Sequence, residues 1–450
     1  MRILSGVFSK NIDRSNRSRV NSLFSLIFKG GSLLINFMLV PLILTLIDAT
    51  QYGVWLTVSS LIAWSSFFDF GLSNGLRNKL TESLALNDIE ASRRYISTMY
   101  ALMIIIFGTL SLLFTFVYGY INWYKLFHIS TETEDLPTLV ILILLFFCFQ
   151  FILKVVYTLC NSFQKPYYIG MIEFFIQLFS LIGVYFLINV HEGGLIKLSF
   201  VLCGIPLIVL LLFNVILFRV KFRKYTPQFN AVDIKLCKNL FAVSLRFFVI
   251  QIAGLIQYQS SSILISHYFS SDDVVVYNLS YKYFSIPNIL FTIILTPFWS
   301  AVTDAYIKKD FRWIKSEVNV YLKMYSFLFV LALLMFFCSS FAYRFWLGEG
   351  EILIPLNVSF WSFVFSVTSM ITALYVSAIN GIGALKIQYM MCFVTPLLFI
   401  GLVYIMNSFF EIGLISVIIA GIISNISGFI IAPIQFYQIM NNKKGIWIKC

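Results

Sequence analysis

Apolar residues run along this chain in long stretches that are separated by short polar connections. Twelve of these stretches are long enough to cross a hydrocarbon core of about 30 Å as helices. They are expected at residues 23–47, 52–76, 96–121, 136–163, 168–190, 195–218, 239–265, 274–300, 321–346, 354–379, 387–408 and 412–437. The pattern therefore predicts an all-α membrane protein with about twelve transmembrane helices and no soluble domain.

The composition agrees with this pattern. Hydrophobic residues make up 60% of the chain and charged residues only 12%, whereas about 25% of the residues in an ordinary soluble domain are charged. The N-terminal segment is polar and basic and has no apolar core, so we expect no cleavable signal peptide.

The connections alternate in charge along the chain. Most of the 32 lysine and arginine residues lie in the N-terminal segment, in the C-terminal tail and in every second connection. The opposite connections carry only Lys125, Lys197 and Arg344. By the positive-inside rule both termini are expected in the cytoplasm. The net charge of +12 follows from this asymmetry, and nucleic acid is not expected as a partner because the basic residues lie on short loops against a membrane.

The two halves of the chain resemble each other. Segments that end at Asp88 and Asp310 match after the second span of each half, and the stretch from Tyr157 matches the one from Tyr375. Because six is an even number, both halves enter the membrane with the same orientation. This predicts two six-helix lobes related by a pseudo-two-fold axis along the membrane normal.

The repeat also predicts the domain organisation. The expected parts are an N-terminal lobe at 1–218, a basic cytoplasmic linker at 219–238, a C-terminal lobe at 239–437 and a cytoplasmic tail at 438–450. Residues 77–95 and 301–320 are predicted to form amphipathic helices at the cytoplasmic surface.

Six charged residues lie at least five residues from either end of a predicted span. They are Lys29, Asp69, Lys154, Glu173, Arg246 and Lys282. A charge at the centre of a span costs about 2.5–3.5 kcal/mol on insertion scales, so such residues usually face a bundle interior or a wet cavity. The set has a net positive charge, which favours an anionic ligand.

Lys29 and Arg246 occupy equivalent positions in the two halves, near the cytoplasmic side. On their helices, Asn36 shares the face of Lys29, and Gln257 shares the face of Arg246. We interpret these two polar helix faces as the walls of a cationic cavity that binds an anionic head group from the cytoplasm. The alternative is that both side chains only reach for the cytoplasmic interface. Lys154 and Lys282 lie further from a cytoplasmic end, so this alternative explains them less well, although Lys282 could reach the outer interface.

The two acidic residues in the spans have two interpretations. Asp69 and Glu173 would be counter-ions of the lysines, which we favour, or would bind a coupling cation such as H⁺ or Na⁺. The sequence contains neither a phosphate-binding GxxxxGK[ST] motif nor an HExxH motif. No catalytic residue, metal or cofactor is therefore expected.

The residues around the second span resemble a known family. The run YGVWLTVSSLIAWSSFFDFGLSNGLRNKLTESLALND at Tyr52–Asp88 is similar to the Wzx-type flippases of lipid-linked O-antigen, in the polysaccharide transporter branch of the multidrug/oligosaccharidyl-lipid/polysaccharide exporter superfamily. The later NSFQKPYYIGMIE also resembles this family's junction between spans four and five.

The resemblance implies twelve spans in two lobes in the bacterial inner membrane. The activity it implies is movement of an undecaprenyl-diphosphate-linked oligosaccharide from the cytoplasmic to the periplasmic leaflet. Membrane lipids, a polysaccharide polymerase and the chain-length machinery would be partners. On this interpretation Lys29 and Arg246 bind the diphosphate, and Lys154 and Lys282 line the path of the sugar.

Two other function classes remain as alternatives. A cation-coupled small-molecule exporter of the same superfamily would carry an acid-rich lumen for cationic drugs, whereas this set of residues is net basic. A membrane polymerase or ligase would carry a large external catalytic loop, which the sequence does not contain. The flippase is therefore the favoured prediction.

Overall fold

The computed structural model describes residues 69–127, 136–190, 194–269, 271–347 and 353–441, most positions of 27–47, and the isolated positions 24, 51, 54, 55, 443, 445 and 447. Every regular element among these residues is a helix, which confirms the all-α prediction. Ten helices in this part of the chain are long and apolar enough to cross a membrane, and a shorter apolar helix at Ile27–Ile43 lies at the first predicted span. Most of the second predicted span, 52–76, lies outside the described residues.

The chain divides into two compact units. The N-terminal unit runs from Val20 to Leu245, and the C-terminal unit includes the described residues from Arg246 onward. The helices of the N-terminal unit are α3 (Leu72–Ala85), α4 (Ile89–Val117), α5 (Trp123–Phe127), α6 (Leu136–Leu153), α7 (Val155–Ser162), α8 (Tyr167–Asn189), α9 (Leu195–Ser199) and α10 (Ile205–Val220). Helix α8 packs against α10.

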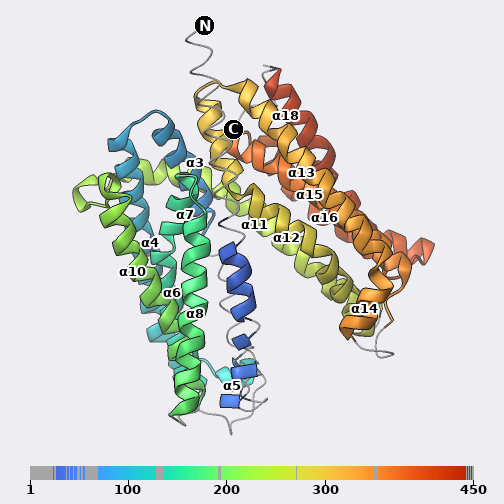
Figure 1. Cartoon of the computed structure of the whole chain (residues 1–450), viewed down its shortest axis with the longest axis horizontal. Helices are drawn as coiled ribbons and strands as arrows, with labels where there is room; N and C mark the ends of the chain where they lie inside the picture. Colours follow the sequence, from blue (N-terminus) through green and yellow to red (C-terminus); the bar gives the residue numbers. More distant parts are fainter. Residues whose placement is uncertain are drawn as a thin grey trace. The chain divides into compact units, whose positions relative to one another are not determined.

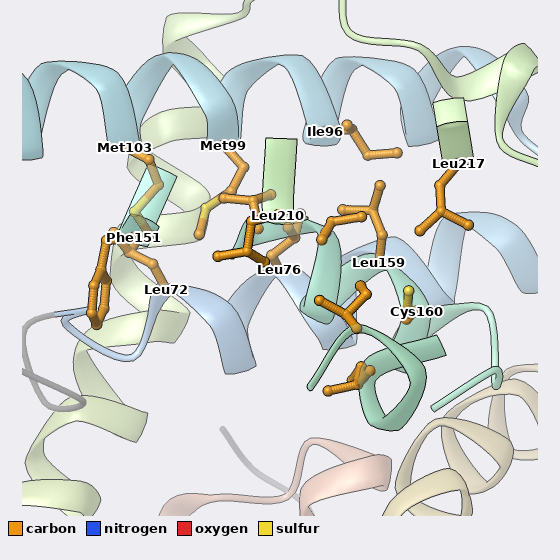
Figure 2. Packing of buried hydrophobic residues seen from close by; sticks show 14 of the residues in the cluster. Leu72, Leu76, Ile96, Met99, Met103, Phe151, Leu159, Cys160, Leu210 and Leu217 are labelled. Carbon is orange, nitrogen blue, oxygen red and sulfur yellow. The ribbon is translucent and has the colours of Figure 1, made fainter. Parts of the chain in front are cut away.

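The core of the N-terminal unit is formed by large apolar side chains from α3, α4, α6, α7, α8, α10 and the beginning of α11 (Ile234–Tyr268). Leu72 of α3, Met99 of α4 and Leu159 of α7 are fully buried and point toward one another (Figure 2). Phe151 of α6 and Leu210 of α10 close the same cluster. Lipid tails are as apolar as these side chains, so the cluster is stabilised by close packing and not by removal from water.

The C-terminal unit is built from long helices around a second core. Its helices are α12 (Ser271–Ile307), α13 (Phe311–Phe337), α14 (Ser339–Leu347), α15 (Leu356–Ile382), α16 (Lys386–Phe410), α17 (Ile415–Ser424) and α18 (Ala432–Met440), and α11 (Ile234–Tyr268) begins in the other unit and ends in this one. Helix α15 packs against both α12 and α13 (Figure 1). Phe298, Ile314 and Leu374 from these three helices are fully buried at the centre of the core.

The prediction of two amphipathic surface helices is wrong. Residues 77–95 contain the end of α3, a turn and the first residues of α4, and residues 301–320 contain the end of α12, a turn and the beginning of α13. Long helices therefore follow one another through tight turns. The ninth span likewise runs over Phe311–Phe337 and not over 321–346, because its first polar turns continue the apolar helix.

The two turns have the same geometry, as the repeat predicts. Asn87 and Lys309 both adopt a left-handed backbone conformation with φ of 58°. The next residue then begins a new helix as its N-cap. The Asp88 carboxylate accepts a hydrogen bond from the backbone N of Ala91 at 2.9 Å, and that of Asp310 accepts one from Trp313 at 3.2 Å. Such caps satisfy backbone N–H groups that the helix leaves without a partner.

The second pair of matching segments, from Tyr157 and from Tyr375, also has a common geometry, but the structural alignment is shifted by one residue. Gln164 has φ of 57° and Gly383 has φ of 81°, and each ends a helix. The backbone N of the following residue, Lys165 or Ala384, bonds the carbonyl of Cys160 or Ile379. Gln164 therefore corresponds to Gly383, although the sequence match from Tyr157 and Tyr375 paired Lys165 with that glycine.

The predicted linker is fastened to the N-terminal unit. The Arg93 guanidinium on α4 donates to the carbonyl of Lys224 at 2.9 Å. Further along the linker, the backbone N of Gln228 donates to Ser97, and that of Asp233 donates to Thr98. These bonds hold the linker as far as the beginning of α11 against the polar first turns of α4.

Candidate functional site

A lysine–glutamate–lysine cluster lies among the membrane helices of the N-terminal unit. The Glu173 carboxylate on α8 interacts electrostatically with both Lys29 and Lys154, and all three side chains are half-buried. Lys29 lies on the helix Ile27–Ile43, which packs against α8 at this level. The ring centroids of Phe28 and Phe174 are 6.0 Å apart. The structure therefore brings together three of the predicted site residues, and their formal charges leave one net positive charge.

Lys154 lies where the helix of the fourth span is interrupted. It separates α6 from α7, and its Nζ lies 5.2 Å from the centroid of the Phe151 ring, within the range of a cation–π interaction. The Leu153 carbonyl next to it accepts a hydrogen bond from the Asn214 side chain at 3.0 Å. Irregular backbone is tolerated inside a membrane only where other groups satisfy it, so Asn214 holds the position from which Lys154 projects.

Asn214 belongs to a polar network that the sequence interpretation missed. Its Nδ2 also donates to the Leu210 carbonyl at 2.8 Å, and its Oδ1 accepts a hydrogen bond from the Tyr100 hydroxyl at 2.6 Å. An asparagine within the apolar run LLLFNVILF is a signal that could have identified this network. Lys323 was also missed. It lies two residues from the beginning of the expected span 321–346 but near the middle of the helix Phe311–Phe337, and its side chain is exposed.

A small cavity is lined by residues on the same two helix faces that carry Lys29 and Glu173. It has a volume of about 230 Å³ and is lined by Asn36, Gln177 and Ser180 together with apolar residues. Gln177 lies one turn after Glu173 on α8, and Asn36 lies two turns after Lys29, so each pair shares a face. The polar helix face predicted from Lys29 and Asn36 thus continues from the charged cluster into a cavity.

Backbone N–H groups at the beginning of α3 bind the Asp69 side chain. Its carboxylate accepts hydrogen bonds from the backbone N of Gly71 at 2.9 Å and of Ser73 at 3.4 Å, at the beginning of α3. Gly71 adopts a left-handed conformation with φ of 70°. These bonds explain why a buried aspartate is tolerated there, and its role as a counter-ion or ion ligand remains a prediction.

The other predicted site residues belong to the C-terminal unit. Arg246 is half-buried on α11, and Lys282 is exposed on α12. The backbone of Gln257 lies within α11, and its side chain is outside the described part of the structure. A shared cavity between these residues and Lys29 remains a prediction. Among the described residues no group of three His, Cys, Asp or Glu side chains could hold a metal ion.

Comparison with solved structures identifies the fold. The chain superposes with a TM-score of 0.75 on a mutant of the Vibrio cholerae MATE transporter VcmN, covering 97% of this chain and 99% of that one at 13% identity. For a MOP superfamily transporter from Pyrococcus furiosus the TM-score is 0.74, with 96% and 97% covered at 13% identity. The chain is therefore a multi-pass membrane protein with the MATE transporter fold.

Comparison of the sequence identifies the family. The family model described as "Polysaccharide biosynthesis protein" matches residues 18–303, more than half of the chain. The chain belongs to this family.

Two relatives agree with this assignment. The "Putative O-antigen export protein" of Yersinia pseudotuberculosis is 23% identical over 363 residues, which are 79% of this chain and 81% of that protein. The "Putative O-antigen transporter" of Salmonella typhimurium is 21% identical over 313 residues, 67% of this chain and 68% of that protein. Together the comparisons confirm the resemblance drawn from Tyr52–Asp88 and the class of transporter, as opposed to enzyme.

Proposed function

We propose that the chain flips an undecaprenyl-diphosphate-linked oligosaccharide from the cytoplasmic to the periplasmic leaflet of the bacterial inner membrane by alternating access, with both termini in the cytoplasm. The observation that carries the proposal is the pair of lysines around Glu173 among the membrane helices of a polysaccharide biosynthesis protein. The names of the O-antigen relatives support the same substrate class. A polysaccharide polymerase would then use the flipped product.

The charged cluster suits a diphosphate head group. Lys29 and Lys154 each offer an ammonium group, and charge-assisted hydrogen bonds to phosphate oxygens are about twice as strong as neutral ones. Glu173 keeps the two cations close together while no substrate is bound, because alone they would repel each other. A diphosphate would then draw the lysines away from Glu173, which favours a change of conformation through differential binding.

A second candidate is a cation-coupled small-molecule exporter, which the MATE fold favours. In that case Glu173 would bind the coupling cation or the cationic cargo. The net positive charge of the cluster opposes this candidate, since two lysines next to the carboxylate repel a cation.

A reconstituted transport assay separates the two candidates. Purified protein in liposomes is given a labelled undecaprenyl-diphosphate-linked oligosaccharide, and its arrival in the opposite leaflet is followed with a lectin that does not cross the membrane. We expect translocation by the wild type and translocation slower by about ten-fold or more in Lys154→Ala, since a charge-assisted hydrogen bond contributes about 1.5–3 kcal/mol and about 1.4 kcal/mol corresponds to a factor of ten.

Lys125→Ala is the matched control, because this lysine is exposed on α5 outside the predicted spans. It should translocate at the wild-type rate. Export of a cationic dye without movement of the lipid-linked oligosaccharide would favour the exporter and contradict the proposal.

A further inference from the structure

The C-terminal unit contains a cavity whose described lining includes none of the charged residues predicted for the site. Its volume is about 410 Å³, within the range of small-molecule sites. The lining comes from α11, α12, α15, α16 and α17. Its described lining residues all belong to this unit.

The lining combines apolar and polar groups and carries no charge among its described residues. Hydroxyl and amide groups from Asn288, Ser369 and Asn425 line the cavity alongside aromatic rings. A charged ligand would find no opposite charge here and would lose its hydration, which is costly in a low-dielectric site. The lining therefore fits a neutral ligand rich in hydrogen-bonding groups.

Hydrogen bonds between α12 and α15 orient the central amide. The Asn288 Nδ2 donates to the Ser366 hydroxyl at 2.8 Å, and this hydroxyl donates to the carbonyl of Phe284 at 2.8 Å. One N–H of the amide is thereby used in the contact between the helices. The side-chain oxygen of Asn288 is left as an acceptor, because among the described residues no donor reaches it. An amide acceptor at a cavity wall matches a sugar hydroxyl.

Aromatic rings form another part of the wall. The rings of Tyr277 and Tyr281 are stacked with centroids 6.2 Å apart, and Phe365 lies 6.2 Å from Tyr281. The faces of aromatic rings carry partial negative charge and attract the weakly positive C–H groups of a sugar ring. Hydroxyl-binding groups combined with aromatic faces are the two elements that a sugar-binding cavity requires.

We infer that this cavity in the C-terminal unit binds uncharged sugar residues of the oligosaccharide. The inference rests on the proposed function and deepens it, because it assigns the glycan to a site of different chemistry from the cluster of Lys29, Glu173 and Lys154. The competing explanation is that the serines and Asn288 only join α12 to α15, as polar side chains do between membrane helices. A binding measurement distinguishes the two.

The measurement uses the full-length protein in detergent and two separate probes. The first probe is the free oligosaccharide released by mild acid from the lipid-linked intermediates of the cells that make this protein. The second is undecaprenyl diphosphate without sugar. Ser369→Phe fills the cavity, and we expect about ten-fold weaker binding of the oligosaccharide, equivalent to about 1.4 kcal/mol, with unchanged binding of undecaprenyl diphosphate. Ser326→Phe, at an exposed position of α13, should leave both affinities unchanged.

Each of the other outcomes has a defined meaning. Unchanged oligosaccharide binding by Ser369→Phe, or binding of undecaprenyl diphosphate alone by the wild type, would overturn the sugar site and leave the proposed function standing. Binding of neither probe by the wild type would overturn the proposed function itself. If Ser369→Phe does not fold, Ser369→Val removes the hydroxyl with less added volume, and unchanged affinity in that variant would also overturn the sugar site.

Discussion

The candidate site depends on a few charged residues within the membrane helices. Lys29, Lys154 and Glu173 were expected to lie in spans from sequence alone, and the structure brings them together. Their electrostatic interaction could not be predicted, because it depends on how three helices pack. Asp69 shows the opposite case, since its polar environment comes from its own next residues at the beginning of α3.

Glu173 and Lys154 are predicted to stabilise each other. Glu173→Gln leaves two uncompensated lysines, and Lys154→Met leaves Glu173 with Lys29 alone, so each single change should lower the thermal stability of the protein. The double variant should recover part of the loss, with a coupling energy of about 0.5–3 kcal/mol for groups in one charged network. Denaturation of the purified variants in detergent measures this coupling. Strictly additive losses would show that the two side chains do not form a pair.

Asn214 is predicted to be important for stability at the helix interruption. Asn214→Leu leaves the Tyr100 hydroxyl and the Leu153 carbonyl without their partner. An unsatisfied buried polar group costs about 1–3 kcal/mol, so the unfolding midpoint should fall. Tyr100→Phe, which removes the hydroxyl but keeps the ring, should have a smaller effect. Equal stability of Asn214→Leu and the wild type would show that the network contributes nothing.

At the scale of the helices, hydropathy located most spans but misplaced several of their ends. The ninth span was expected to begin at 321, whereas α13 begins at Phe311 after the Asp310 cap. The first turns of α13 carry Arg312, Lys315 and Glu317, so a hydropathy window excludes them although they continue the helix. Helix caps are local signals that could have corrected this boundary.

The close approach of α15 to α12 should depend on Gly381. A Cβ added there would lie 2.6 Å from the Trp299 carbonyl oxygen and 3.0 Å from the Cβ of Val302. Gly381→Ala should therefore push the helices apart and destabilise the protein by about 1–3 kcal/mol. Gly401→Ala on α16 is the control, because a Cβ there meets no atom within 4 Å. A stability loss no larger at Gly381 than at Gly401 would contradict this packing.

At the scale of the whole molecule, the sequence predicted the fold class, the repeat and the family, and the structure and the comparisons agree. The cavity of the C-terminal unit was not predicted. Its lining residues, such as Asn288, Ser369 and Asn425, lie far apart in sequence on different helices, so no local motif marks them. On our two proposals the charged cluster binds the diphosphate and the uncharged cavity binds the sugar residues.

The symmetric pair of cations makes a prediction for the intact transporter. Lys29→Ala combined with Arg246→Ala removes the cation expected at equivalent positions of both halves. Cells that carry the double variant should lose surface polysaccharide while the protein still inserts in the membrane. Immunoblots of membrane fractions and of surface polysaccharide measure the two quantities. Normal polysaccharide in the double variant would contradict a cavity that uses both residues.

The central claim is the movement of a lipid-linked oligosaccharide between leaflets, and deletion of the gene tests it most directly. In the deletion strain, the location of the lipid-linked intermediate is measured with a periplasmic glycan-modifying enzyme that acts only on the outer leaflet. We predict that complete repeat units accumulate on undecaprenyl diphosphate in the cytoplasmic leaflet, protected from the enzyme, and that the wild-type gene restores access. Accumulation of accessible, unpolymerised units in the periplasmic leaflet would contradict the account.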